Sequence, residues 1–311
     1  MNLKRIIFRL IRKATLQDLK IRNFWTRVSP VCTFIDVGAS YFYNESWSIA
    51  TQLSTSTMVQ VDPIEKNLEY VDMRQVRAKV IKAPFALSRT GGLHDLYVTN
   101  VDSGSSMFEP WISPDLQPRL PEEIYSYFYP MKTVEISTKK LIDVIPPDSI
   151  NQPIVIKIDA QGSEQEIIQG AEILLQTHQI IAIEVEASLL RHPFAKGGTK
   201  FSELQIYLEN YGYELVAMRL LHTHGPFKPS DLSKQGVLNE CDSLFVLNHR
   251  AISLRPLEFR ISSFFALCLY GQFGDALRLI KNDPELNERV QSSLGESKRL
   301  EQVLKMHKTY F

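Results

Sequence analysis

Cysteine is scarce and long apolar runs are missing from this chain of 311 residues. Its three cysteines, Cys32, Cys241 and Cys268, are odd in number and form no Cys-x-x-Cys pair. This argues against a disulfide framework or a zinc knuckle and favours a reducing, cytoplasmic location. The longest apolar runs, such as residues 264–270, are too short to span a membrane, and no apolar signal-peptide core follows the charged N-terminus.

The formal net charge of the chain is zero, because 35 Lys and Arg residues balance 35 Asp and Glu residues. No overall basic field exists to hold a nucleic-acid backbone, so we expect no nucleic-acid partner. Residues 1–27 depart from this balance, since eight basic side chains and one acid give them a charge of +7. Within them, apolar residues recur at helical spacing over 3–11. This pattern predicts a basic amphipathic helix that packs on its own domain or contacts a membrane surface or an acidic partner.

Two phosphate-binding motifs are not found in the sequence. A dinucleotide-binding fold carries G-x-G-x-x-G after its first strand, whereas residues 38–44 contain a single glycine, Gly38. No G-x-x-x-x-G-K-[ST] loop occurs either. A site that cradles a pyrophosphate is therefore not expected.

Short apolar runs rich in β-branched residues are the clearest positive signal. They predict four buried parallel strands, at residues 31–36, 58–62, 153–159 and 180–186. Helical stretches follow the first three strands, at residues 45–53, 64–77 and 163–175. This alternation predicts a doubly wound α/β sheet. Two later strands, 213–219 and 242–247, are expected to pair antiparallel, because the loop between them is too short for a crossover helix.

The alternation of strands and helices is interrupted at residues 88–131. An extra strand is expected at 93–98, and five prolines follow between Pro110 and Pro130. Long irregular segments of this kind are often functional. We therefore interpret 88–131 as an insertion or lid whose aromatic residues either form a wall over an acceptor or pack into a local core that holds the insertion in place.

After residue 250 the sequence pattern becomes helical. Apolar residues in 264–280 predict a helical hairpin, and a last amphipathic helix is predicted from Leu300, Val303, Leu304 and His307. These helices would pack on the chain itself or form a homo-oligomer. We thus divide the chain into a basic helical region at 1–27, a central domain at 28–249 and a C-terminal helical extension at 250–311.

Three aspartates stand at the carboxyl ends of predicted parallel strands: Asp36, Asp62 and Asp159. In open α/β sheets, ligands bind in the crevice along that edge. Asp62 ends the second strand, and a carboxylate there can accept hydrogen bonds from both hydroxyls of a ribose. For each aspartate the alternative role is to cap a turn or a helix N-terminus. The three acids together predict a ligand site at this edge of the sheet.

Several segments resemble the signature segments of FkbM-type S-adenosylmethionine (SAM) methyltransferases. They are residues 34–39 (FIDVGA), 61–63 (VDP), 157–164 (KIDAQGSE), 183–186 (IEVE) and 242–245 (DSLF). The resemblance covers roughly residues 31–248, and 157–164 is its most specific part. It implies a class I SAM methyltransferase with a Rossmann-like, doubly wound, seven-stranded mixed sheet. Ser40 and Phe42 stand where many members carry Asn and Gly, which makes the loop after the first strand bulkier.

The resemblance also implies a donor site for SAM. The cofactor contacts would come from Asp36, Gly38, Ala39, Asp62, Pro63, Ala86 and Asp159. Asp36 and Gly38 would shape the loop under the methionine part of SAM, and Asp62 would hold the ribose hydroxyls. Ala86 would lie near the adenine, and Asp159 near the methyl group. The implied acceptor is a hydroxyl of a sugar, a glycan or a secondary metabolite.

Methyl transfer to a hydroxyl is helped by a base that removes the acceptor proton. The catalytic candidates are Asp159, His192, His222 and His224, with Glu184 and Glu186 as further carboxylates. We expect a histidine to take the proton, because its pKa lies near neutrality. We expect no metal, since the sequence shows no dense cluster of acids. An amine acceptor and a catalytically silent scaffold are the alternatives on the same fold.

Overall fold

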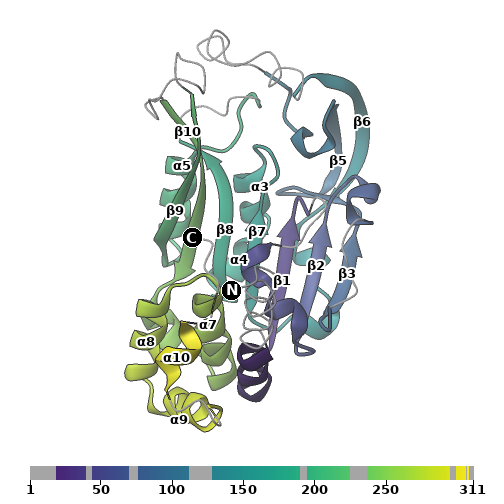
Figure 1. The fold of residues 1–311 in the computed structure, drawn as a ribbon. Helices are drawn as coiled ribbons and strands as arrows, with labels where there is room; N and C mark the ends of the chain where they lie inside the picture. The colour runs from purple at the N-terminus through teal and green to yellow at the C-terminus, as the bar shows by residue number, and fades with distance from the viewer. Residues whose placement is uncertain are drawn as a thin grey trace, which may run out of the picture.

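Seven strands of the computed structural model form one mixed sheet, in the order β3-β2-β1-β7-β8-β10-β9 (Figure 1). They are β1 (Cys32–Val37), β2 (Ser56–Val61), β3 (Lys79–Ala83), β7 (Ile154–Ile158), β8 (Ile180–Ser188), β9 (Tyr213–His224) and β10 (Val237–Leu247). β10 runs antiparallel to β8 and β9, and the other neighbours are parallel. The structure describes residues 19–39, 44–69, 76–111, 128–189, 195–224, 237–294, 299–305 and 307. The predicted seven-stranded mixed sheet is confirmed.

Helices cover both faces of this sheet. They are a helix over residues 19–28, α3 (Glu164–Gln169), α4 (Glu172–Gln176), α5 (Phe201–Glu209), α6 (His249–Ser253), α7 (Leu257–Leu269), α8 (Phe273–Lys281), α9 (Pro284–Ser292) and α10 (Leu300–Leu304). Neighbouring residues of a strand point to opposite faces of the sheet, so Phe245 of β10 lies on one face and Leu244 on the other. Phe245 stacks on Phe201 of α5. Phe34 of β1 lies on the same face as Glu184 and Leu244, and there it meets Phe265 of α7. The sheet is therefore doubly wound, as predicted.

Two of the predicted helices are wrong within the described residues. In place of helices at 45–53 and 64–77, the structure has short 3₁₀ turns, η1 (Glu45–Trp47), η2 (Ala50–Gln52) and η3 (Glu65–Leu68). At the start of the first segment the Asn44 side chain accepts a hydrogen bond from the Ser46 backbone N–H at 2.9 Å. Such local bonds compete with those of an α-helix. Residues 70–75, within the second segment, lie outside the described residues.

A second, three-stranded sheet occupies much of the predicted insertion. It consists of β4 (Ala86–Leu87), β6 (Pro130–Lys139) and β5 (Gly92–Thr99), in that order. The predicted strand at 93–98 is thus confirmed as part of β5, whereas β6 was not predicted. Just after β4 the chain lies so close to α3 that a Cβ at Gly170 would stand 2.7 Å from the Ser88 carbonyl oxygen. The predicted helix at 163–175 is interrupted at this glycine. Residues 112–127 lie outside the described residues.

The remaining 3₁₀ turns join these strands and helices. They are η4 (Asp102–Gly104), η6 (Leu141–Val144) and η7 (Pro147–Ser149). Among the residues that the structure describes, no helix has the length and apolar character that a membrane span requires. Residues 1–18, most of the predicted basic helix, lie outside this description.

The C-terminal helices share a hydrophobic core with the sheet and with the helix at 19–28 (Figure 1). Trp25 packs against Phe264 and Phe265 of α7, with ring centroids 5.4 and 4.6 Å away. Phe265 also meets Phe34 of β1. The Trp25 indole donates a hydrogen bond to the His307 imidazole at 2.9 Å. The two ends of the chain therefore meet beside the sheet, and the C-terminal helices bury their apolar residues against this chain.

Candidate active site

A cavity of about 230 Å³ opens at the carboxyl ends of β1, β2 and β7. The donor-site residues predicted from the sequence that line it are Gly38, Asp62, Pro63, Ala86 and Asp159. Its lining also includes residues after β5, within the predicted insertion at 88–131: Asp102, Ser103, Ser105, Ser106 and Met107. The fold therefore brings residues from five separate segments to one concave site, at the sheet edge where α/β proteins bind ligands.

Gly38 forms the tight turn that follows β1. Its φ of +77° lies in the left-handed region, and a Cβ there would stand only 1.9 Å from the Asp159 carbonyl oxygen. The backbone N–H groups of Gly38 and Ala39 both donate to the Val61 carbonyl, at 2.9 and 3.2 Å. Ala39 is buried behind this turn and does not line the cavity. The missing side chain lets this turn lie directly against the Asp159 backbone at the edge of the cavity.

Asp62 lies at the end of β2 with only 6% of its surface exposed. Its Oδ1 accepts hydrogen bonds from the Ile64 backbone N–H at 2.7 Å and from the Asn67 amide at 3.3 Å. No described residue donates to Oδ2. Burial raises the pKa of Asp62 to about 6, although the bonds from Ile64 and Asn67 lower it. The carboxyl is thus held in place with one oxygen available to a ligand in the cavity.

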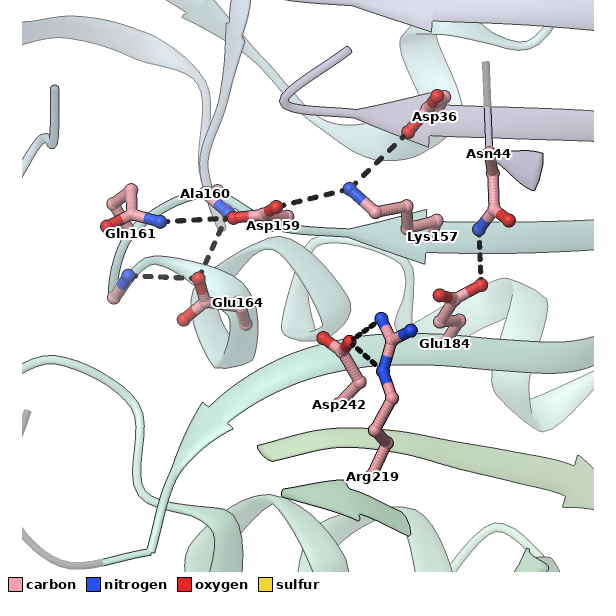
Figure 2. Close-up of polar contacts among 11 residues, drawn as sticks. Asp36, Asn44, Lys157, Asp159, Ala160, Gln161, Glu164, Glu184, Arg219 and Asp242 are labelled. Atoms are coloured by element: carbon pink, nitrogen blue, oxygen red, sulfur yellow. Dashed lines mark hydrogen bonds and ion pairs between the residues drawn. The ribbon is translucent and has the colours of Figure 1, made fainter. Parts of the chain in front are cut away.

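A row of charged side chains crosses the sheet just below its carboxyl edge (Figure 2). Asp36 of β1, Lys157 of β7 and Glu184 of β8 are neighbours in the strand register and so share one face. The Lys157 ammonium lies 3.9 Å from Asp36 Oδ1 and 3.2 Å from Asp159 Oδ2. Burial alone would lower the pKa of Lys157, but the carboxylates of Asp159, Asp36 and Glu184 outweigh it and raise the pKa. Lys157 is therefore the cation that balances this buried row.

The two acids at the ends of the row have raised pKa values. Burial raises the pKa of Asp36 to about 6 and that of Glu184 to about 7, and the charge of Lys157 lowers both. Glu184 also accepts a hydrogen bond from the Asn44 side chain (Figure 2). Asp36 is buried behind the turn at Gly38 and does not line the cavity. Asp36, expected to contact the cofactor, is thus placed outside the cavity lining.

Asp159 differs from the other acids because both of its oxygens are engaged. Oδ2 faces the Lys157 ammonium, and Oδ1 accepts from the Gln161 side-chain amide at 3.1 Å. Glu164 supports the same loop, since its Oε1 accepts from the backbone N–H groups of Ala160 and Gly162 at 3.0 and 2.9 Å. Burial raises the pKa of Glu164 to about 7. Asp159 is therefore a fixed wall of the cavity.

A second group of acids lies beside Asp159, on the ends of β8 and β10. Glu186 is paired with Asp242 in the strand register, and Asp242 forms an ion pair with Arg219 of β9 (Figure 2). Burial and the neighbouring Asp159 raise the pKa of Glu186 well above its usual range. Burial likewise raises the pKa of Glu240 to about 7. Among the described side chains, no group of three His, Cys, Asp or Glu residues could hold a metal ion.

The histidine candidates are only partly placed by the structure. β9 continues as far as His224, so His222 and His224 lie in a strand, and their predicted place in a loop is wrong. The bulged pairing of β9 with β10, which sets His222 opposite Glu240, extends the strand beyond its apolar run. His192 lies outside the described residues. A histidine base stays a prediction.

The family model of the methyltransferase FkbM domain matches residues 36–215, which is more than half of the chain. The chain therefore belongs to this family and is a methyltransferase. No curated protein matches it.

The fold is similar to two solved structures. One is a TehB-like SAM-dependent methyltransferase from Corynebacterium glutamicum, 11% identical, with a TM-score of 0.30 over 74% of this chain and 88% of that chain. The other is a precorrin-6y C5,15-methyltransferase from Geobacter metallireducens, 12% identical, with a TM-score of 0.28 over 75% of this chain and 89% of that chain.

Proposed function

We propose that this methyltransferase takes its methyl group from SAM, bound in the cavity over β1, β2 and β7, and transfers it to a hydroxyl of a small molecule or glycan. The donor assignment rests on two features that meet at the cavity, a turn without a side chain at Gly38 and a buried acid at Asp62. Gly38 presents backbone where any side chain would clash, and Asp62 offers a carboxyl oxygen to the cavity. A ribose diol is a suitable partner for that carboxyl.

The residues of the cavity fit the parts of SAM. Asp62 would hold the ribose hydroxyls, Ala86 would lie against the adenine, and Gly38 would leave room for the methionine part. When bound, SAM supplies a methyl carbon activated by a positively charged sulfur. The task of the chain is then mainly to align this carbon with the acceptor oxygen. Asp159, held by Lys157 and Gln161, is a rigid wall for that alignment.

Glu186 is the described carboxyl best suited to take the acceptor proton. It lies beside Asp159 on the neighbouring strand, and no hydrogen bond from a described residue occupies it. Burial and the neighbouring acids raise its pKa, which makes its carboxylate a stronger proton acceptor. In this proposal a Glu186 carboxylate oxygen would take the proton of the acceptor hydroxyl, and the sulfur of SAM would keep the electron pair of the broken S–CH3 bond as a neutral thioether. His192, His222 and His224 are the alternative bases.

The donor proposal is tested by calorimetric titration with SAM. Asp62→Ala removes the carboxyl acceptor and should weaken SAM binding by about 1–3 kcal/mol, or roughly 5- to 150-fold in Kd. Asp148→Ala is a matched control, because this exposed aspartate lies away from the cavity. Equal affinity in both variants would refute the placement of the donor. No binding by the wild-type protein would favour the silent scaffold instead.

The base is tested by transfer of a labelled methyl group from SAM to cell-extract compounds. Glu186→Gln should lower the rate by about 10²–10⁴ and leave the Kd for SAM nearly unchanged. Glu288→Gln, on the exposed side of α9, should keep the full rate. If Glu186→Gln stays active and one of the three histidine variants does not, the base is that histidine.

An amine acceptor is the second candidate, favoured by the acids that border Asp159. Glu186, Glu240 and Asp242 gather on the strand ends, and Arg219 of β9 pairs with Asp242. Buried carboxylates are stabilised by a cation, which a protonated amine would provide. Analysis of the labelled product separates the two candidates, since an O-methyl ether and an N-methyl amine differ in charge at neutral pH.

A further inference from the structure

Ser106, in the segment after β5, contacts the loop that follows β7. Its hydroxyl donates a hydrogen bond to the Gln161 carbonyl oxygen at 2.7 Å and accepts one from the Phe108 backbone N–H at 2.9 Å. The backbone of Ser106 also pairs with Tyr97 of β5, through bonds of 2.9 and 3.2 Å. Only 6% of Ser106 is exposed, and both Ser106 and Gln161 line the cavity. One buried serine therefore joins the three-stranded sheet to the carboxyl edge of the large sheet.

The loop after β7 has a backbone that needs support from its neighbours. Gln161 has a φ of +51° and Gly162 a φ of +108°, so two consecutive residues have a positive φ. For Gln161, which carries a Cβ, this conformation costs free energy and persists only where surrounding contacts hold it. The Gln161 side chain in turn donates to Asp159 Oδ1 at 3.1 Å (Figure 2). The backbone at Gln161 thus decides where the amide that holds Asp159 lies.

Thr199, which follows β8, holds the next residue of the same loop. Its hydroxyl donates to the Gly162 carbonyl at 2.9 Å and accepts from the Gln165 backbone N–H at 2.9 Å. The segment of Thr199 is itself tied to the insertion, since the Lys196 backbone N–H donates to the Glu109 carbonyl at 3.0 Å. The insertion and the segment after β8 therefore hold this loop together.

The backbone of Asp159 is fixed independently of Ser106. Its N–H donates to the Val37 carbonyl at 3.1 Å, and its carbonyl lies against the turn at Gly38. Loss of the Ser106 hydroxyl would therefore free the loop beyond Asp159 and the amide of Gln161, while the turn after β1 keeps its place. The effect falls on the side chain of Asp159 and leaves the donor-binding turn intact.

We propose that Ser106 is a positioning residue for methyl transfer, which holds Gln161 so that the Asp159 carboxyl stays fixed beside the methyl group of bound SAM. This inference rests on the proposed function, since it assumes that SAM binds in the cavity with its methyl group near Asp159. The insertion then contributes to the transfer step, although it lies outside the large sheet.

The test compares Ser106→Ala with Ser262→Ala. Each variant removes one buried hydroxyl that donates at 2.7 Å to a backbone carbonyl distant in the sequence. The acceptor for Ser262 of α7 is Val31, directly before β1 and so at the opposite edge of the sheet. We expect Ser106→Ala to lower the rate of labelled-methyl transfer from saturating SAM to cell-extract compounds by about 10- to 100-fold, with a nearly unchanged Kd for SAM. Ser262→Ala should lower the melting temperature and keep both the rate and the Kd.

Two further variants separate positioning from loss of stability. Ser106→Thr keeps the hydroxyl and should restore most of the rate. Gln161→Met removes the amide that holds Asp159 but keeps the length of the side chain, so it should lower the rate as Ser106→Ala does. Because Ser106 acts through Gln161 in this proposal, adding Ser106→Ala to Gln161→Met should lower the rate little further.

Hydrogen–deuterium exchange without SAM measures the loop directly. The backbone N–H groups of Ala160 and Gly162 donate to Glu164 Oε1 within this loop. In Ser106→Ala these two groups should exchange severalfold faster than in the wild type, because the loop opens more often. In Ser262→Ala their exchange should match that of the wild type.

Any of four results would overturn the inference. They are an unchanged rate or an unchanged loop exchange in Ser106→Ala, an equal fall in rate in both serine variants, and additive effects in the double variant with Gln161→Met. If Ser106→Ala does not fold, Ser106→Cys decides, since its weak S–H donor should still lower the rate and a full rate would refute the role of the hydroxyl. Failure of the wild-type protein to bind SAM is a separate result, which refutes the proposed function and this inference with it, whatever the exchange of the loop shows.

Discussion

Gly38 is the residue at which the geometry of the site is least tolerant of change. Gly38→Ala would place a Cβ 1.9 Å from the Asp159 carbonyl oxygen, a backbone atom that cannot rotate away. The left-handed φ of +77° adds a strain of about 1–3 kcal/mol for a residue with a side chain. We expect a lower free energy of unfolding, measured with denaturant, and a Kd for SAM raised by about tenfold or more.

Gly274→Ala is the matched control for this substitution. Gly274 lies in α8, and a Cβ there would meet nothing within 4 Å. Alanine favours a helix by roughly 0.5–1 kcal/mol over glycine, so this variant should be slightly more stable. Wild-type stability and SAM affinity in Gly38→Ala would show that the turn can relax and would contradict its role.

Single residues at strand ends could be predicted from the sequence, whereas their partners could not. Gly38 and Asp62 follow short apolar runs directly, so their place at the cavity is a consequence of local order along the chain. Lys157 stands inside a strand, and its role depends on the register that puts Asp36 and Glu184 beside it. A charged residue one position before the end of a buried strand was the signal for it. Contacts such as that of Ser106 with the loop after β7 arise from tertiary packing and leave no local signal.

At the scale of the elements, buried strands were predicted better than exposed ones. The runs that became β1, β2, β7 and β8 are rich in apolar residues and almost continuously buried, as in sheets covered on both faces. β3 and β6 were missed because most of their residues are exposed or only half buried, and their polar side chains dilute the pattern. The α5 helix was missed too, since it is short and only Leu204 and Leu208 are buried.

Helix α7 is the element through which the C-terminal extension enters the core. Phe265 is fully buried between Trp25 and Phe34. Phe265→Ala should therefore lower the free energy of unfolding by about 3–5 kcal/mol. Leu277→Ala on α8 is the control, because this side chain is 38% exposed and should change stability by about 1 kcal/mol or less.

Denaturant unfolding, followed by both tryptophan fluorescence and circular dichroism, measures this effect. The two signals should change together in wild-type and variant protein, because Trp25 and Trp47 report on contacts between the C-terminal helices and the rest of the chain. A small loss in Phe265→Ala, or a separate early transition, would mean that α7 is a detachable addition.

On the scale of the whole molecule, charge is distributed very unevenly between surface and interior. The chain has no net charge, yet seven acids lie at or near the carboxyl edge of the sheet, and among the described residues only two of them, Asp36 and Asp159, form an ion pair, both with Lys157. The seven are Asp36, Asp62, Asp159, Glu164, Glu184, Glu186 and Glu240. This edge is suited to bind a cation, including the sulfonium of SAM, and it destabilises the ligand-free protein when all of its acids are ionised.

The stability of the ligand-free protein should therefore fall as pH rises. Burial raises the pKa values of Asp36 and Asp62 to about 6, and those of Glu164, Glu184 and Glu240 to about 7. A carboxyl whose pKa is higher in the folded than in the unfolded chain binds its proton more tightly when folded. Its contribution is complete below the unfolded pKa, near 4, and is lost as pH rises through the folded value. Burial lowers the pKa of His307 to about 4, so this residue destabilises the folded protein as pH falls below about 6.5. We expect the five carboxyls to outweigh this single histidine.

We expect the melting temperature without SAM to fall by several degrees from about pH 5 to about pH 8, as measured by calorimetry. Glu164→Gln keeps an oxygen that can accept from Ala160 and Gly162 but removes a group that titrates near 7. It should flatten the decline, whereas Glu288→Gln on the surface should leave it unchanged. SAM at saturating concentration should also flatten it, because its positive charge stabilises the ionised acids. A melting temperature that rises over this range would mean that the acids at the sheet edge are already compensated in the free protein.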